Sequence, residues 1–294
     1  MGKTISFATH PQIFILEGVI TIVIGLVGFI FLVDFPDKAK FLKPHEREHT
    51  INRLNIERGD GETHGLSWHL LRHHLSDWTM WWISLVYLCN VGPIYSLSYF
   101  VPSILNGMGY SPSDSIIMSA PPYIAALGLL WSGSWAADKL RKRVWLIIFQ
   151  ALMCITGLAM VQARNLSASV RFAGTFFAVM GAQCNTPAII TFQQNNVVGS
   201  SKRNVASALN IGSGALGGII GRSYTLLRFI LNYSTIFRAA DAPGYKPGMM
   251  ATIGMQAFLL VGTLFITFIF WMRNRAADRN NTPIQGVLGW RYTL

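Results

Sequence analysis

Seven stretches of the chain carry no Asp, Glu, Lys or Arg: 18–33, 82–113, 115–137, 144–163, 172–201, 204–221 and 247–272. A helix needs about 20 mostly apolar residues to cross the hydrocarbon core of a bilayer, and flanking side chains can extend a shorter stretch. The pattern therefore predicts an all-α, polytopic membrane protein with about seven transmembrane helices. We place these helices at 13–33, 81–102, 114–137, 144–162, 171–193, 204–221 and 248–272.

The composition supports a membrane protein, since 51% of the 294 residues are hydrophobic and only 13% are charged. A soluble domain carries about 25% charged residues. If the predicted helices alternate in direction, 17 of the 24 Lys and Arg residues lie in segments on one side of the bilayer. The positive-inside rule makes that side cytoplasmic. The net charge of +11 is thereby explained by topology, and no nucleic-acid partner is expected.

One long polar segment, 34–79, separates the first apolar stretch from the others and is predicted to be a cytoplasmic loop. Within it, "PHEREHTINRLNIERGD" begins with Pro44 and reaches Gly59 near its end, which favours a short surface helix. Four tryptophans near the next apolar stretch are typical of anchors at the membrane interface: Trp68, Trp78, Trp81 and Trp82.

The stretch "GSWAADKLRKR", residues 133–143, ends the third apolar segment with an acid followed by bases. Gly133 would let two helices approach closely. Asp138 could accept hydrogen bonds at the N-terminus of a neighbouring helix, whose dipole favours an anion. Four bases would hold the loop in the cytoplasm: Lys139, Arg141, Lys142 and Arg143. A simple stop-transfer end is the alternative, but it requires only the bases.

This order of glycine, aspartate and bases resembles the signature cytoplasmic loop of the major facilitator superfamily, in its second-half copy. It departs from many members at Leu140 and Arg141, where they carry a residue and then glycine. Further stretches resemble the fungal allantoate, nicotinate and pantothenate permeases, described as anion:cation symporters. These are "DFPDKAKFLKPHERE", "NVGPIYSLSYFVPSILNGMGYSP", "SAPPYIAA", "NNVVGSSKRNVASALNIGSGALGGIIG", "DAPGYKPGMM" and "GWRYTL".

The resemblance implies that the chain is the C-terminal half of a twelve-helix transporter with one preceding helix. The expected parts are a remnant of the N-terminal half at 1–33, the cytoplasmic central loop at 34–79, a six-helix bundle at 80–275 and a cytoplasmic tail at 276–294. Members bind a small-molecule substrate between their two halves, near the bilayer midplane. The implied partners are a small organic anion, the lipid bilayer and a proton as coupling ion, and no cofactor is implied.

Two segments do not follow the resemblance. The stretch at 1–12, "MGKTISFATHPQ", stands where the family has a tryptophan-containing segment directly before "IFILEG". The stretch at 222–235, "RSYTLLRFILNYST", lies between the glycine-rich span and "DAPGYKPG", which follow each other closely in the family. An intron read through in frame would produce such a segment at 222–235. A genuine helical extension is the alternative.

Polar residues within the apolar stretches are candidates for substrate contact, because an unpaired polar group in lipid is costly. Asn90, Tyr95 and Tyr99 share roughly one helix face, and Gly92 and Pro93 would loosen that helix. Gln183 and Asn185 lie near the middle of another span and could bind a carboxylate or amide. The alternative for these residues is hydrogen bonding between neighbouring helices.

Two other groups are interpreted as structural. The run "NIGSGALGGIIG" has small residues at three- and four-residue spacing, which favours tight helix packing, and no strand precedes it as a dinucleotide site would require. The amides at 193–196 are predicted to cap a helix and order the loop before Lys202 and Arg203. Cys89, Cys154 and Cys184 are predicted to be small core residues.

Ionisable residues outside these groups give weaker signals. His69 and His73 lie one helical turn apart with His74 adjacent, but no third ligand is placed, so no metal site is expected. Glu17, at the outer edge of the first span, is interpreted as an interfacial carboxylate; a proton carrier is the alternative.

The sequence therefore favours a permease of the plasma membrane that carries a small organic anion or vitamin-like carboxylate by alternating access with proton coupling. A truncated, non-transporting membrane fragment is the first alternative. A membrane-embedded enzyme is the second, and the charge-free spans argue against it because catalytic acids and bases are lacking there. The substrate itself cannot be named from the sequence.

Overall fold

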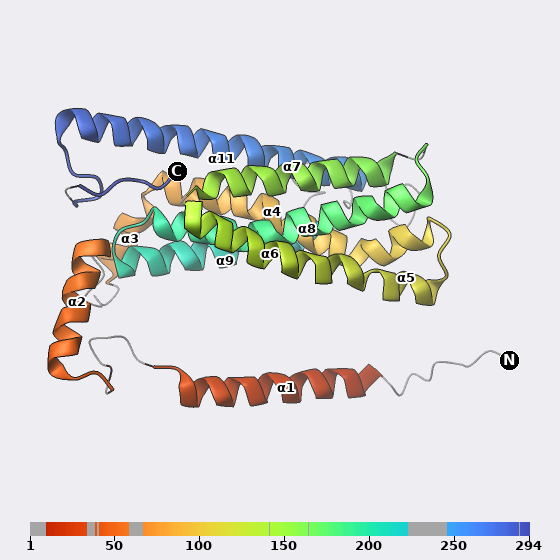
Figure 1. The fold of residues 1–294 in the computed structure, drawn as a ribbon, viewed down its shortest axis with the longest axis horizontal. Helices are drawn as coiled ribbons and strands as arrows, with labels where there is room; N and C mark the ends of the chain where they lie inside the picture. The colour runs from red at the N-terminus through yellow and green to blue at the C-terminus, as the bar shows by residue number, and fades with distance from the viewer. Residues whose placement is uncertain are drawn as a thin grey trace. The chain divides into compact units, whose positions relative to one another are not determined.

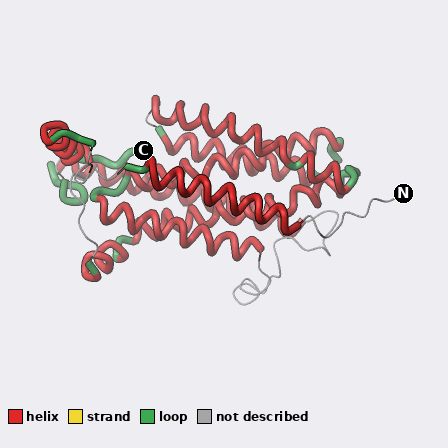
Figure 2. Tube along the Cα trace, turned by 90° about the horizontal axis from the view of Figure 1, so that it is seen from below, coloured by secondary structure: helices red, strands yellow, loops and turns green. Residues whose placement is uncertain are grey.

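A computed structural model describes residues 10–33, 39, 41–58, 67–140, 142–163, 165–222, 246–287 and 289–294. Apart from one isolated bridge between Ile284 and Val287, the regular structure in these ranges is helical (Figures 1 and 2). The chain divides into two compact units, Met1–Thr63 and His64–Leu294. The predicted all-α class is confirmed.

The first unit contains two described helices. Helix α1, His10–Phe31, covers the first predicted span except for its last two residues, and its apolar side chains are exposed from Ile15 onward, as in a helix that faces lipid. Helix α2, Pro44–Arg58, is the predicted surface helix. It begins at the proline, and Glu46 accepts a hydrogen bond from the Lys43 backbone N–H at its start.

The second unit contains all six remaining predicted spans. Its described helices are α3 (Trp68–Leu75), α4 (Trp78–Asn106), α5 (Pro112–Met118), α6 (Ala120–Leu140), α7 (Arg143–Gln162), α8 (Ala168–Asn195), α9 (Ser200–Arg222) and α11 (Lys246–Asn280). The long helices lie side by side along a common direction (Figure 1). The span predicted at 114–137 is divided between α5 and α6 at Ser119, because Pro121 and Pro122 have no backbone N–H with which to continue α5.

Among the described residues, four segments are long and apolar enough to cross a membrane: Trp78–Tyr99, Pro112–Leu140, Arg143–Gln162 and Gly248–Asn280. Helices α8 and α9 are as long but more polar. Helix α8 contacts α4, α6 and α7, so much of its surface faces protein and not lipid. A polar residue is tolerated in such a central helix because neighbouring helices can supply hydrogen-bond partners.

Glycines set two of the closest helix contacts. A Cβ added to Gly214 or Gly218 of α9 would lie 2.7 Å from the Tyr87 ring or 2.8 Å from the Tyr95 ring of α4, so the predicted tight packing of this glycine-rich run is confirmed. Helices α7 and α8 are equally close. A Cβ on Gly157 would lie 2.3 Å from the Ala178 nitrogen.

The predicted core position of the cysteines is confirmed. All three cysteines are free and buried. Trp68, Trp78 and Trp81 are exposed at the end of the bundle where α3 meets α4. Trp82 differs from the predicted anchor, since its Nε1 donates to the Gly262 carbonyl of α11 at 2.9 Å and its ring packs against that helix.

The C-terminal segment folds back on the bundle. Helix α11 continues past residue 275 and ends at Asn280. Asn281 takes the left-handed conformation (φ 49°), and the Thr282 N–H donates to the Ala277 carbonyl, which is the pattern of a Schellman cap. The chain from 281 to 294, which we call the tail, thereby returns along the end of the bundle. Residues 1–9 and 223–245 lie outside the described part, and with them most of the two segments, 1–12 and 222–235, that do not follow the resemblance.

Candidate functional site

Asn90, in the middle of α4, is fully buried between three helices. Its Nδ2 donates to the Ala182 carbonyl and the Thr186 hydroxyl of α8, at 3.2 and 3.0 Å. Its Oδ1 accepts a hydrogen bond from Gln256 Nε2 of α11 at 3.4 Å. An amide bonded on both sides in an apolar interior holds its neighbours in one arrangement. Asn90 therefore takes the helix-linking role that the sequence left open.

Further uncharged polar groups continue this interior network. Gln256 is fully buried, and its Oε1 has no hydrogen-bond partner among the described residues. Ser84 of α4 donates to Asn210 Oδ1 of α9 at 3.0 Å, which adds a second link from α4. The bundle interior therefore contains amides and hydroxyls, including a buried acceptor, Gln256 Oε1, that is unpaired within the described residues.

Gln183 and Asn185 lie on different faces of α8. Asn185 is buried and donates to the Ile147 carbonyl of α7 at 3.3 Å, while its Oδ1 is unpaired among the described residues. Residues 182 and 186 face α4, and Cys184 donates to the Ala126 carbonyl of α6. Because successive residues turn by about 100°, Gln183 points between α4 and α6. It is half-buried and makes no side-chain hydrogen bond within the described residues.

The tyrosine candidates lie nearer the surface. Tyr95 and Tyr99 of α4 are 43% and 50% exposed, and the Tyr95 ring covers α9 at Gly218. Gly92 packs against Met255 of α11. The structure thus does not gather the five candidates into one site: two amides link helices, two tyrosines are partly exposed, and Gln183 is half-buried and points between α4 and α6.

The motif at 133–143 links the end of α6 to the start of α7. Gly133 is buried where a Cβ would lie 3.2 Å from Leu146 Cδ1 of α7. Asp138 forms an ion pair with Arg143 in the first turn of α7. Asp138 thus contacts a neighbouring helix N-terminus as predicted, through a side chain and not through backbone amides. Lys139 lies over the Trp135 ring, Lys142 is the exposed N-cap of α7, and Arg141 lies outside the described residues.

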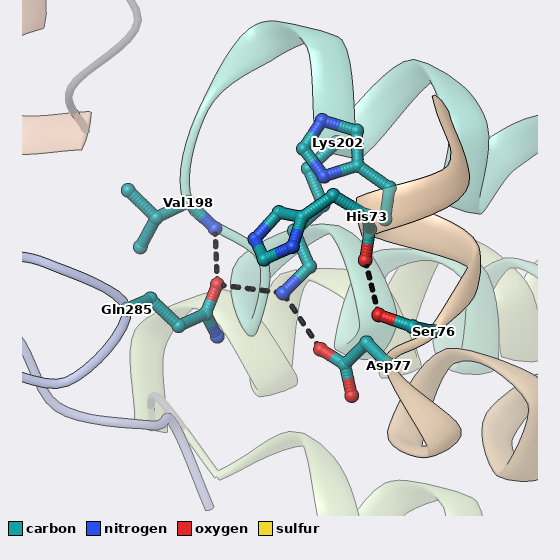
Figure 3. Close-up of a pocket in the computed structure, with 7 residues that line it drawn as sticks. His73, Ser76, Asp77, Val198, Lys202 and Gln285 are labelled. Atoms are coloured by element: carbon teal, nitrogen blue, oxygen red, sulfur yellow. Dashed lines mark hydrogen bonds and ion pairs between the residues drawn. The ribbon is translucent and has the colours of Figure 1, made fainter. Parts of the chain in front are cut away.

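A second ion pair links α4 to α9 at the same end of the bundle (Figure 3). Asp77 is the N-cap of α4, where its Oδ1 accepts from the Thr79 N–H and hydroxyl at 3.0 and 2.6 Å. Its Oδ2 lies 2.7 Å from Lys202 Nζ. Burial raises the pKa of Asp77, but the hydrogen bonds from Lys202 and Thr79 and the lysine charge outweigh burial, so this pKa lies below its ordinary value of 3.8.

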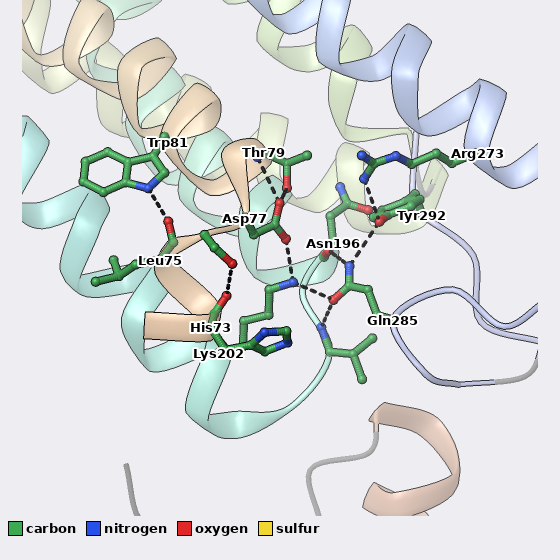
Figure 4. A network of polar contacts seen from close by, with 12 residues as sticks. His73, Leu75, Asp77, Thr79, Trp81, Asn196, Lys202, Arg273, Gln285 and Tyr292 are labelled. Atoms are coloured by element: carbon green, nitrogen blue, oxygen red, sulfur yellow. Dashed lines mark hydrogen bonds and ion pairs between the residues drawn. The ribbon is translucent and has the colours of Figure 1, made fainter. Parts of the chain in front are cut away.

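Gln285 of the tail completes this network (Figure 4). Its Oε1 accepts hydrogen bonds from the Val198 N–H at 3.1 Å and from Lys202 Nζ at 3.3 Å. Its Nε2 donates to the Asn196 carbonyl and the Tyr292 hydroxyl, at 3.0 and 3.3 Å. Gln285 thus joins the α8–α9 loop to the tail.

Two side-chain amides hold the rest of the tail through paired backbone contacts. Asn196 accepts from the Thr293 N–H at 2.8 Å and donates to the Thr293 carbonyl at 3.2 Å. Asn274 of α11 makes the same exchange with Tyr292, both at 2.9 Å. The Tyr292 ring stacks on Phe270, with 4.1 Å between centroids. The predicted capping role of the amides at 193–196 is confirmed for Asn196, the C-cap of α8.

A pocket of about 410 Å³ adjoins the ion pair. Most of its lining residues have polar side chains, and they come from three parts of the chain: His73, His74, Ser76, Asp77, Val198, Lys202 and Gln285. Burial, followed by the charges of Lys202 and His73, lowers the pKa of His74 below 6.5, although Asp77 acts in the opposite direction. In the described part of the chain no three His, Cys, Asp or Glu residues are grouped as metal ligands.

Sequence reasoning did not single out Asp77, Gln256 or Gln285. A signal existed for Asp77, because aspartate directly before an apolar helical run is a preferred N-cap. Gln256 is a single amide in an apolar run, and the sequence alone does not distinguish a buried amide from one that faces lipid. Gln285 lies in the segment predicted as a cytoplasmic tail, and its partners in the α8–α9 loop and α9 are distant in sequence.

Comparisons with known proteins agree on one family. The profile described as Major Facilitator Superfamily matches residues 4–221. "MFS transporter prlL" of Fungal sp. (strain NRRL 50135) is 28% identical over 294 residues, which is 99% of this chain and 57% of that protein. The allantoate permease of Saccharomyces cerevisiae is 23% identical over 277 residues, 91% of this chain and 48% of the permease.

A protein of Agrobacterium vitis, provisionally named a tartrate transporter, is 26% identical over 224 residues, which is 76% of this chain and 50% of that protein. The chain thus spans about half the length of the curated relatives it matches. No solved structure matches it.

Proposed function

Because the chain belongs to the major facilitator superfamily, we propose that it forms the substrate-binding C-terminal half of a permease for a small organic carboxylate. Transport would occur by alternating access, with the site formed where this bundle meets an N-terminal six-helix half. The match to the family over residues 4–221 is the observation that carries this proposal.

Relatives support the carboxylate class. The names of two similar proteins specify allantoate and tartrate, both of which are organic carboxylates. The predicted arrangement fits this proposal, with 34–79 as the central loop, 80–275 as the six-helix bundle and 276–294 as the cytoplasmic tail. We propose the plasma membrane as the location and a proton as the coupling ion.

Gln183 is the side chain that we propose touches substrate. It points from α8 into the sector between α4 and α6, and its amide can donate to a carboxylate without placing a charge inside the membrane. Asn90 and Asn185 are proposed to shape the same region from behind by fixing α8 against α4 and α7. Tyr95 and Tyr99 are proposed to face the N-terminal half.

The motif at 133–143 is proposed to act in switching between conformations. The pair of Asp138 and Arg143 joins two helix ends across the short α6–α7 loop, where a bond can favour one state of a moving bundle. Gly133 allows the two helices to approach closely beside it. Lys139, Arg141 and Lys142 are proposed to hold the loop at the cytoplasmic face.

A second candidate is a non-transporting membrane fragment. The observation that favours it is length, since the chain spans about half of each similar transporter. Such a fragment would insert and fold but would lack half of the substrate site.

Reconstitution distinguishes the two candidates. Proteoliposomes would contain this chain alone, this chain co-expressed with the N-terminal half of the prlL relative, or the intact relative as control. We expect the second preparation to take up labelled allantoate or tartrate, faster under an inward proton gradient, and a Gln183→Leu variant to lose most of this uptake. If only the intact relative transports any carboxylate, the fragment is the correct description.

A further inference from the structure

Two hydrogen-bond donors at the start of α9 converge on one acceptor. The Val198 N–H and the Lys202 ammonium both donate to Gln285 Oε1, at 3.1 and 3.3 Å. Gly199, with φ +89°, makes the turn between them that a residue with a side chain would resist. Helix α9 is 23 residues long, and its N-terminal dipole adds positive potential at the same place. Donors arranged in this way are typical of a site for an oxyanion.

Gln285 is a weak occupant of this position. Its amide oxygen carries no formal charge, and its backbone is in the left-handed region at φ 50°, which costs free energy for a residue with a side chain. A carboxylate or phosphate oxygen would instead form charge-assisted hydrogen bonds, which are about twice as strong as neutral ones.

A third polar group lies beside the two donors. His74 lines the same pocket, is only 9% exposed, and its Nε2 atom has no hydrogen-bond partner among the described residues. His73 lines the pocket as well, and the volume of about 410 Å³ accommodates a small anion. A buried ring nitrogen without a partner is costly, so a ligand that bonds to it is favoured.

The charges around the pocket permit an anion but limit its affinity. Asp77 is the carboxylate in the lining; it holds Lys202 from one side at 2.7 Å and is itself bonded to Thr79. Arg203, on the next residue of α9, donates to the Val197 carbonyl and adds positive charge to the same loop. We therefore expect binding in the millimolar range for a free anion.

We propose that this pocket is a binding site for a small oxyanion, held by Lys202, the Val198 N–H and His74, with Gln285 of the tail as an internal competitor. Binding would displace Gln285 and remove its link between the tail and the α8–α9 loop, while the contacts between Asn196 and Thr293 would still hold the tail. The oxyanion is either a free cytosolic carboxylate or phosphate, or the headgroup phosphate of an anionic phospholipid, since both offer the same oxygens. The site is separate from Gln183 and does not depend on transport.

The test uses the full chain purified in nanodiscs of phosphatidylcholine. Inorganic phosphate is titrated against chloride at constant ionic strength, and the thermal unfolding midpoint is recorded. A ligand that binds only the native state raises this midpoint in a saturable manner. We expect saturation with the wild-type chain, and half-saturation at about tenfold lower phosphate in Gln285→Ala, because the competing acceptor is removed. Arg291→Ala, a tail variant outside the pocket, should keep the wild-type half-saturation.

Two further variants connect the response to the donors. Lys202→Met combined with Gln285→Ala should abolish the saturable response. If that variant does not fold, His74→Ala combined with Gln285→Ala replaces it and should weaken the response. Repeating the titration with anionic phospholipid in the nanodisc identifies the source: a lost phosphate response indicates a headgroup, and an unchanged one indicates a free anion. Equal half-saturation in wild type, Gln285→Ala and Arg291→Ala, or a response that survives loss of both His74 and Lys202, would overturn the proposal.

Discussion

The Lys202 ammonium at the start of α9 lies 2.7 Å from Asp77 Oδ2 at the N-cap of α4, so one ion pair links helix ends that are 125 residues apart in the sequence. The two side chains are only 15% and 25% exposed. Such a pair is screened less by solvent than a surface pair, and loss of one partner leaves the other buried without its counter-charge.

We expect Lys202→Met to lower the free energy of unfolding by about 1–3 kcal/mol, because Asp77 loses a charge-assisted hydrogen bond. Denaturant unfolding of the purified chain measures this loss. Arg291→Ala is the matched control, since its partner Asp278 is 64% exposed, and it should change the free energy by less than about 0.5 kcal/mol. Equal effects of the two substitutions would show that the pair of Asp77 and Lys202 stabilises the fold no more than the exposed pair of Asp278 and Arg291 does.

The same pair should respond to acid in one direction. The pKa of Asp77 is lowered in the folded chain from its ordinary value of 3.8, so its contribution is complete above that value and is lost as the pH falls through the lower native pKa. We expect the stability difference between wild type and Asp77→Asn to be constant from roughly pH 7 to 5 and to shrink below pH 3.8. Asparagine keeps the N-cap acceptor, so the difference isolates the charge. A gap that widens on acidification would contradict the assignment.

A further prediction concerns close helix packing. A Cβ on Gly157 of α7 would lie 2.3 Å from the Ala178 nitrogen of α8, which is backbone and cannot rotate away. We expect Gly157→Ala to separate the two helices and to lower stability by about 1–3 kcal/mol. The measurement is the yield and thermal unfolding midpoint of the purified chain.

Gly128 of α6 provides the control, because nothing lies within 4 Å of its added Cβ. Gly128→Ala should leave the midpoint unchanged or raise it slightly, since alanine favours a helix by up to about 1 kcal/mol over glycine. If both substitutions behave alike, the α7–α8 contact is looser than the structure indicates.

The helices were predictable from sequence because a bilayer imposes both a length and an apolar composition on each span. The partners within the bundle were less predictable. The repeated glycines at 211–221 predict a closely packed helix face. Gly157 and its partners Gly174 and Ala178 occur singly in ordinary apolar stretches and give no such signal. Trp82 has the residue type and sequence position expected of an interfacial anchor, and only the structure shows that it packs against α11 and bonds to Gly262.

The candidate site was predictable in residue type but not in arrangement. The amides within the spans were identified from the sequence. Nothing in the sequence indicates, however, that Asn90 bonds to α8 and α11 while Gln183 makes no side-chain hydrogen bond within the described residues. That difference depends on how α4 and α8 are each rotated about their own axes, which is set by their contacts with neighbouring helices. The network around Gln285 was missed because its partners outside the tail are 83 to 89 residues away.

Another prediction separates folding from substrate contact. Asn90→Leu should lower the unfolding midpoint, because the Ala182 carbonyl, Thr186 and Gln256 lose a shared partner. Gln183→Leu should leave the midpoint nearly unchanged, since Gln183 makes no side-chain bond within the described residues. In a transporter assembled with an N-terminal half, however, it should reduce carboxylate uptake at least tenfold. Normal uptake by a well-folded Gln183→Leu variant would remove this residue from the proposed site.

The last prediction concerns Asp138, which is paired with Arg143 across the α6–α7 loop and is 65% exposed. Exposed ion pairs contribute little to stability, so Asp138→Ala should insert and unfold like wild type, within about 0.5 kcal/mol. If the pair favours one conformation of the moving bundle, Asp138→Ala and Arg143→Ala should each slow uptake in the assembled transporter by a similar factor.

The double variant decides whether the two residues act together. Removal of Asp138 and Arg143 at once should slow uptake no more than either single change, because both single changes already break the same contact. Effects that multiply would mean that each residue acts through a different partner. Unchanged rates in all three variants, at equal expression and membrane insertion, would show that the motif only ends a span and holds a loop on one side.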